Sequence, residues 1–194
     1  YVDPIDYRFM TPWKFNFNVG TTWDNKLAFG AEYELENYHS FKLYEGVEGY
    51  ENAFTSLVDS NVKNMLKTVH TFKVGAEIKL NPEIAFRAGY NYSTAAFDKG
   101  AYRSLIEFTD SPVYVDTFTE TSYSNQFDLH RLTCGFGYRT SSFYFDLAYQ
   151  YTMQKADFFA FDDYYEDGGK TYYLPATEIS KDRSRLTMTL GYRF

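Results

Sequence analysis

Charged residues recur at every second position of several segments, so they would share one face of a β-sheet. The candidates for a lumen-facing polar surface are Lys14, Glu32, Glu77, Arg87, Arg139, Asp146 and Arg185. Mixed charges on an enclosed face can form paired ladders, because an isolated charge there is costly. A guanidinium group can also bind a carboxylate with two hydrogen bonds, so Arg87, Arg139 or Arg185 could hold an anionic ligand. The sequence leaves both roles open.

The sequence gives little support for a catalytic site or a metal site. His39, His70 and His130 do not have the spacing of metal or haem ligands. His130 lies close to Asp128 in the chain, yet no Ser, His and acid arrangement can be assembled. The acidic stretch 162–167 lacks the spacing of a calcium loop. We therefore predict no catalytic residue, no metal and no cofactor, and we expect that the protein is not an enzyme.

Composition narrows the class of protein. Of the 194 residues, 21% are aromatic, well above ordinary usage. The fold must therefore provide a surface or a core that holds so many large aromatic side chains. The mean hydropathy of -0.47 and the lack of a run of roughly 20 apolar residues exclude helical membrane spans. Strands that are apolar on one face only are still permitted. The net charge of -7 argues against nucleic acid as a partner, and the lone Cys134 cannot form an intrachain disulfide.

Alternation of apolar and polar residues predicts about seven strands. The segments are 12–23, 26–36, 71–80, 84–93, 130–140, 142–154 and 183–194. In the first of them, Phe15, Phe17 and Val19 alternate with Asn16 and Asn18. Glycines recur on the polar side, which is typical of a crowded inner wall. The lengths suit tilted transmembrane strands of roughly 9–11 residues, so we predict an all-β, antiparallel transmembrane barrel wall.

The connections between these segments differ strongly in length. Short turns are expected at 24–26, 81–83 and 140–142, and long loops at about 37–68, 96–126 and 156–182. Short turns at one rim and long loops at the other are typical of outer-membrane barrels, with the short turns in the periplasm. A soluble antiparallel sheet also alternates and has hairpins, and it is the alternative.

The C-terminal segment alternates up to the last residue. Its outward residues, Leu190, Tyr192 and Phe194, resemble the assembly signal that the barrel-insertion machinery of bacterial outer membranes reads. Bacterial single-chain barrels have an even number of strands, whereas about seven are expected here. We therefore expect residues 1–194 to be the C-terminal half of one barrel domain, with the other strands supplied by an N-terminal half. A missed eighth strand around 170–178 is the alternative.

One long loop contains a helical pattern. An apolar stripe of Phe54, Leu57, Val58 and Met65 predicts a short amphipathic helix near 51–66. The stripe could collect hydrophobic ligand at the outer surface. It could equally pack the loop onto the mouth of the barrel, which is the usual role of such stripes.

Three parts of the chain resemble the C-terminal half of the FadL/TodX-type outer-membrane transporters. They are Thr-Pro-Trp at 11–13, the hairpin with Val-Gly-Ala-Glu at 74–77 and Arg-Ala-Gly-Tyr-Asn-Tyr at 87–92, and the hairpin with Gly-Tyr-Arg at 137–139 and Asp-Leu-Ala-Tyr-Gln-Tyr at 146–151. The resemblance covers most of the chain except the long loops.

This resemblance implies a monomeric barrel of fourteen strands in the bacterial outer membrane, plugged by an N-terminal hatch. It implies passive passage of long-chain fatty acids or other hydrophobic compounds. The expected partners are the N-terminal half, membrane lipid or detergent, a hydrophobic ligand and the barrel-assembly machinery. The hatch and the kinked strand of the family cannot be mapped here. A barrel that serves as a binding or protein-secretion accessory, a barrel lipid hydrolase or protease, and a soluble β-sandwich are the other possibilities.

Overall fold

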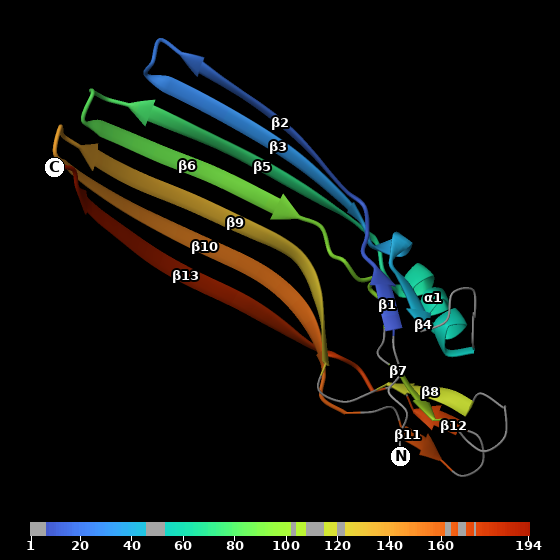
Figure 1. Cartoon of the computed structure of the whole chain (residues 1–194). Coiled ribbons are helices and arrows are strands. Elements are labelled where there is room, and N and C mark those ends of the chain that lie inside the picture. Colours follow the sequence, from blue (N-terminus) through green and yellow to red (C-terminus); the bar gives the residue numbers. More distant parts are fainter. Residues whose placement is uncertain are drawn as a thin grey trace.

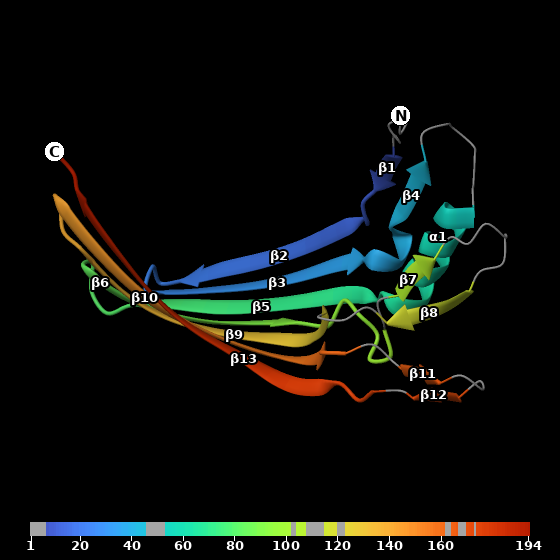
Figure 2. The same cartoon turned by 90° about the horizontal axis from the view of Figure 1, so that it is seen from below.

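The computed structural model is predominantly antiparallel β-sheet (Figure 1). It describes residues 7–45, 53–101, 104–107, 115–119, 123–161, 164–166, 170–172 and 174–194. Figures 1 and 2 show one curved, open layer, with the smaller elements gathered at one of its ends. We call this end the loop end and the opposite one the turn end.

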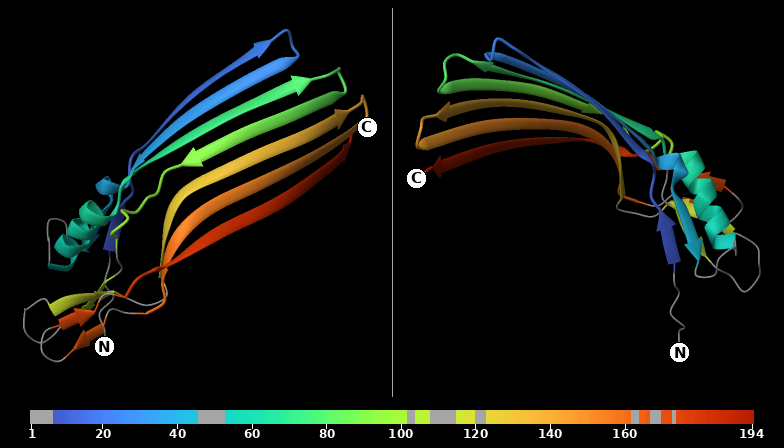
Figure 3. Two further views of the ribbon diagram at one scale, coloured as in Figure 1. Left: turned by 180° about the vertical axis from the view of Figure 1, so that it is seen from behind. Right: turned by 45° about the horizontal axis from the view of Figure 1, so that its top comes forward.

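Seven strands form the main sheet, in the order β13-β10-β9-β6-β5-β3-β2, and each is antiparallel to its neighbours. They are β2 (Lys14–Trp23), β3 (Leu27–Asn37), β5 (Thr68–Lys79), β6 (Ile84–Ser93), β9 (Tyr123–Arg139), β10 (Phe143–Phe159) and β13 (Thr177–Tyr192). Each overlaps a segment where the sequence predicts a strand. The last three extend toward the loop end well beyond the predicted limits. Figure 3 shows these long strands, coloured from yellow to red, curving toward the loop end.

The loop end carries the remaining elements, most of which the sequence did not predict. They are β1 (Tyr7–Met10), the 3-10 helix η1 (Tyr38–Ser40), β4 (Lys42–Glu45), α1 (Ala53–Met65), β7 (Ser104–Glu107), β8 (Val115–Thr119), β11 (Tyr164–Glu166) and β12 (Lys170–Tyr172). The short strands pair as β1 with β4, β7 with β8, and β11 with β12. Residues 170–172 thus pair with β11 in a small hairpin and add no eighth strand to the main sheet.

Local chemistry accounts for the tight turns. Asp24 and Asn25 both have φ of 50°, and the Lys26 amide donates to the Trp23 carbonyl at 3.1 Å. The connection has three residues, 24–26, between the paired Trp23 and Leu27. Asp and Asn tolerate the left-handed conformation that such a tight turn requires. In the next hairpin, Asn81 Oδ1 accepts the Ile84 amide at 2.7 Å. These turns hold the strands in register.

That register places alternate residues in continuous rows across the sheet, because cross-strand partners share a face. One row contains Val19, Ala31, Val74, Tyr90, Leu132 and Tyr151, and it ends at Ser184 on β13. On the opposite face, one row contains Asn18, Glu32, Lys73, Asn91, Arg131, Thr152 and Arg183. The sheet therefore has an apolar face and a polar face along its whole width.

Within the described residues, neither face of the main sheet is covered by a second layer. The chain exposes 14519 Å², whereas a typical folded monomer of its mass of 22.7 kDa exposes about 9,500 Å². Among the described residues, the only buried apolar ones are Val62, Ala101 and Ala156, all near the loop end. Large side chains such as Trp23 and Phe17 are 76% and 65% exposed. The hydrophobic residues thus form a surface and not a core.

The long strands bend where β9 gains a residue relative to β10. The register shifts between Gln154 and Ala156, and Gln154 Nε2 donates to the Phe127 carbonyl at 3.0 Å inside this bulge. A bulge bends its strand and increases the local twist. Beyond the bulge the ends of β9 and β10 turn away from the sheet (Figure 1). In the described part of the chain, no helix is both long and apolar enough to cross a bilayer.

Candidate functional site on the two faces of the sheet

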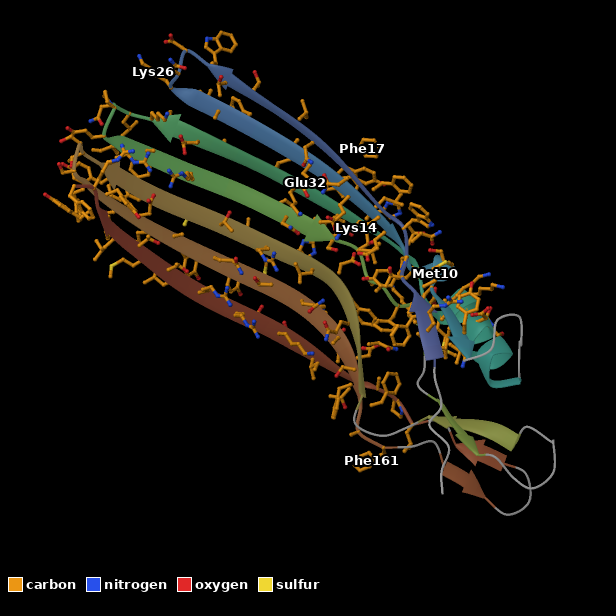
Figure 4. The ribbon with its side chains drawn as sticks, in the orientation of Figure 1. Met10, Lys14, Phe17, Lys26, Glu32 and Phe161 are labelled. Atoms are coloured by element: carbon orange, nitrogen blue, oxygen red, sulfur yellow. The ribbon has the colours of Figure 1, made fainter. Side chains whose placement is uncertain are left out.

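Ion pairs cover the polar face of the first strands. Lys14 Nζ lies 2.9 Å from Glu34 on β3, and Lys73 Nζ lies 2.7 Å from Glu32 on the same strand. Asn16 Nδ2 also donates to Glu32, at 2.7 Å. Figure 4 shows Lys14 and Glu32 near each other, with Phe17 projecting away from them. Two of the predicted lumen-facing residues, Lys14 and Glu32, therefore belong to one polar network.

Arg87 joins three strands in a second network. Its Nε lies 2.7 Å from Glu77 on β5, and its Nη1 lies 2.7 Å from Asp146 on β10. The side chain must pass over β9 to reach Asp146, and Gly137 is the residue of β9 at that point. A Cβ at Gly137 would lie 2.8 Å from Asp146 Oδ1 and 3.3 Å from Arg87 Nη1, so a side chain there would displace the pair. The register thus brings Glu77, Arg87 and Asp146 together.

Arg139 and Arg185 lie on the same polar face but outside both networks. The Arg139 guanidinium lies 5.9 Å from the centre of the Tyr144 ring, within the range of a cation–π contact. Arg185 is the cross-strand partner of Gln150 and has no side-chain hydrogen bond or ion pair among the described residues. All seven predicted polar-face residues share one face, and the structure divides them into two networks and two separate arginines.

A row of glycines crosses the middle of the first four strands. Gly20, Gly30, Gly75 and Gly89 are successive cross-strand partners, and Thr133 on β9 follows. Without side chains here, the polar face has a hollow of about 770 Å³ that Glu32, Lys73, Arg87 and Arg131 help to line. The sequence showed these glycines, but only the register shows that they align into one row. The glycine row forms the bottom of this hollow, and the charged side chains form its sides.

The apolar face has a hollow of about 650 Å³ behind the same row, lined by Ala31, Ala76 and Ala88 and flanked by Phe29 and Tyr90. Small residues thus lie on both sides of the backbone in this band.

Polar side chains of the apolar face are paired with one another near the loop end. The Tyr33 hydroxyl lies 2.7 Å from His70 Nδ1, and the Tyr90 hydroxyl lies 2.7 Å from His130 Nδ1. The sequence did not predict these pairs, because each joins residues of different strands. The aromatic residues suggested an interfacial band, but their partners depend on the order of strands in the sheet.

Asp128 is likewise engaged. It accepts the Tyr92 hydroxyl at 2.6 Å and the Ala95 amide at 2.9 Å, whereas His130 Nδ1 is bonded to the Tyr90 hydroxyl. No group of three His, Cys, Asp or Glu side chains suited to a metal lies within the described ranges. The acidic stretch 162–167 falls outside the described residues except for the backbone of 164–166.

The other two predicted features lie at opposite ends of the sheet. Helix α1 begins and ends within the predicted range, and Val62 on it is buried. Val58 and Met65 are partly buried, whereas the side chains of Phe54 and Leu57 lie outside the described residues. At the turn end, Leu190, Tyr192 and Phe194 are 57%, 68% and 109% exposed. The sheet thus carries exposed aromatic residues at its turn end and a loop helix at the other.

No family model, curated protein or solved structure matches this chain.

Proposed function

We propose that this chain forms part of the wall of a FadL/TodX-type β-barrel in the bacterial outer membrane, and that the barrel passes hydrophobic small molecules such as long-chain fatty acids by diffusion. One observation carries the proposal: an apolar face extends over all seven strands without cover, opposite a face of ion pairs. Exposed apolar surface of this extent marks a membrane or a partner. Lipid can cover this face while the polar face lines an interior.

The height of the apolar band supports a bilayer as the covering medium. On β10, the residues of the apolar face are apolar or aromatic from Phe143 to Met153, and the next one is Lys155, which is paired with Glu178 at 2.9 Å. This span is about 33 Å along a strand, or about 25 Å along the membrane normal at a tilt of ~40°. The hydrophobic band of an outer-membrane barrel has a similar height, about 25 Å.

The open edges of the sheet support closure by further strands. Strands β2 and β13 each have one neighbour among the described strands, and both run from the loop end to the turn end. Antiparallel closure therefore needs an odd number of added strands, because both outer strands of the added set must run the opposite way. We propose that the N-terminal half of the same barrel supplies them.

Uptake of a labelled long-chain fatty acid by bacterial cells tests the transport function. The host would lack its own outer-membrane importers and would carry the protein assembled in its outer membrane. We expect uptake with the unaltered protein and a severalfold decrease with Gly30→Trp, because the indole would fill the hollow on the polar face. The backbone can accept the change, since no atom lies within 4 Å of a Cβ at Gly30.

The control is Lys155→Gln, which alters the apolar face beyond the apolar band and should leave uptake unchanged. Every variant must be assembled in the membrane in the same amount as the unaltered protein. Absence of uptake by the assembled, unaltered protein would refute transport. In that case a stable protein partner would favour the accessory role, and lipid or peptide hydrolysis would favour an enzyme.

A further inference from the structure

Two hydrogen-bonded pairs of side chains adjoin each other where β6 lies beside β9. The Tyr90 hydroxyl lies 2.7 Å from His130 Nδ1, and the Tyr92 hydroxyl donates to Asp128 Oδ2 at 2.6 Å. The ring centres of Tyr92 and His130 are 5.0 Å apart, so the two pairs are in contact. We call these four residues the phenol cluster. It brings two phenols, an imidazole and a carboxylate together from two neighbouring strands.

The phenol cluster lies at the loop end of the apolar face. Tyr92 and His130 are cross-strand partners, and the next residue of their row is Met153 on β10. Met153 is the last residue of the apolar band before Lys155. Tyr90 is exposed, and the other three members of the cluster are half-buried. A small ion can therefore approach the cluster from the edge of the band.

The donor atoms of the cluster are those that suit a ferric ion. Fe(III) is a hard cation that binds phenolate and carboxylate oxygens, and imidazole is also a common iron ligand. Two phenolates and one carboxylate carry three negative charges, which balance the three positive charges of the ion. A complex without net charge is favoured at the edge of an apolar band, because an unbalanced charge would be costly there.

The spacing within each pair also suits one ion. Octahedral ligands at about 2.0–2.1 Å from an ion lie about 3 Å from their neighbours. The paired atoms of the cluster are already 2.7 Å and 2.6 Å apart. The second oxygen of Asp128 accepts the Ala95 amide at 2.9 Å, and such an outer contact orients a metal-binding carboxylate. Each pair can therefore exchange its shared proton for a bond to the ion with little movement.

From this juxtaposition we propose that the phenol cluster is a binding site for a ferric ion. Binding releases the two phenolic protons to water, each phenolate oxygen forms a bond to iron, and the iron stays ferric. The site goes beyond the proposed function, because it lies on the apolar face and does not require transport. The spacing of His, Cys and carboxylates in the sequence did not predict it, since two of its donors are phenols that only the pairing of β6 with β9 brings to the others.

Titration with ferric nitrilotriacetate tests the site. The detergent-solubilised protein, purified as assembled in the membrane, would be followed by visible absorption, because phenolate ligands give ferric iron an intense charge-transfer band. We expect this band in the unaltered protein, and we expect it to saturate at one ion per chain. Absence of the band would overturn the proposal.

Variants of the phenol cluster connect the band to these residues. Tyr90→Phe and Tyr92→Phe keep the aromatic rings, and each should lower the intensity of the band and weaken iron binding about tenfold or more. The double variant should lack the band. Asp128→Asn should keep the band and also bind iron about tenfold or more weakly, because it removes a negative charge and leaves both phenols.

The matched control is Tyr33→Phe. It removes a phenol that lies 2.7 Å from His70 Nδ1 on the same face, in a pair that has no carboxylate partner in the described part of the chain. The band and the affinity should be unchanged in this variant, and circular dichroism would verify that every variant retains the sheet.

Two further results would overturn the ferric site. A band that persists in the double variant would show that iron is bound by others of the 20 tyrosines. An equal loss of the band in Tyr33→Phe and in the variants of the phenol cluster would show that the cluster has no special role. Fatty-acid uptake is measured separately, so neither result bears on the transport proposal.

Discussion

At the scale of single residues, glycines decide which side chains can meet. Gly137 lets Arg87 pass over β9 to Asp146, and Tyr144 lies over Gly191, whose added Cβ would overlap its ring. Gly30 has no atom within 4 Å of such a Cβ. The three positions share a strand environment and differ in what a methyl group would meet. Their substitution therefore separates the effect of contact from the effect of backbone flexibility.

We predict that alanine at these positions lowers stability in the order Gly191, Gly137, Gly30. Gly191→Ala should cost about 1–3 kcal/mol, because the Tyr144 ring must leave its place. Gly137→Ala should cost about 1 kcal/mol or less, because the Arg87–Asp146 pair is half-exposed. Gly30→Ala should be neutral or stabilising, since alanine loses less entropy in a strand. Chemical denaturation in detergent measures all three, and equal effects would contradict these contacts.

The turn after β6 contains an ion pair between Asp98 and Lys67, and its stability depends on pH. The Asp98 carboxylate is held by Lys67 at 2.9 Å and by the Gly100 amide, and these hydrogen bonds lower its pKa from the ordinary value of 3.8. A lowered pKa in the folded state stabilises the turn above that ordinary value and loses this effect as the pH falls through the lowered one. The side chains are exposed, so the effect is small.

We predict faster amide exchange in residues 94–101 at a pH below the lowered pKa of Asp98 than above it, after correction for the intrinsic pH dependence. Asp98→Asn should show fast exchange at both pH values, because it cannot pair with Lys67. The bridge between Leu66 and Phe97, which lies in the same turn, is a suitable reporter. Identical protection in the variant and the unaltered protein at neutral pH would show that the pair contributes nothing.

At the scale of elements, the alternation of residue types predicted the main sheet because one side of each strand is consistently apolar. The prediction for 84–93 agrees with β6 at both ends. It failed to reach the full length of β9, β10 and β13, where polar residues such as Lys155 and Asp182 enter the apolar face and a bulge shifts the register. The short strands of the loops were missed, since they have too few residues for a period.

The site was predictable only in part, for a related reason. Alternation placed Glu77, Arg87 and Asp146 on one face, but their contact depends on β9 lying between β6 and β10. Arg131 and Arg183 illustrate the same point, because they are far apart in the chain and yet are both cross-strand partners of Thr152. Sequence pattern gives the face of a residue, whereas strand order gives its neighbours.

The two faces can be compared at adjacent residues of β9. Cys134 is exposed on the apolar face, and Thr133 points to the polar face beside Gly89. We predict that a bimane label on Cys134 is strongly quenched by lipids with brominated acyl chains in reconstituted protein. A label at Thr133→Cys, in a chain with Cys134→Ser, should be quenched much less. Equal quenching at both positions would contradict the proposal that lipid covers the apolar face.

At the scale of the whole molecule, the described sheet lacks a buried hydrophobic core, which is the usual source of folding stability. Its large hydrophobic side chains are on the surface, and no large side chain among the described residues is fully buried. Cross-strand hydrogen bonds and ion pairs define its shape, but the hydrophobic contribution must come from whatever covers the apolar face. In the proposed barrel, where lipid covers this face, folding and insertion into the membrane would be a single process.

The direction of the two edge strands has a consequence for self-association. If two copies stood side by side with the same orientation, β13 of one would meet β2 of the other in parallel, unlike every seam within the sheet. An antiparallel seam between copies requires one of them to be inverted, so that its loop end lies beside the turn end of the other. The shared direction of the two edge strands therefore disfavours the closure of two copies of this chain into one ring of strands.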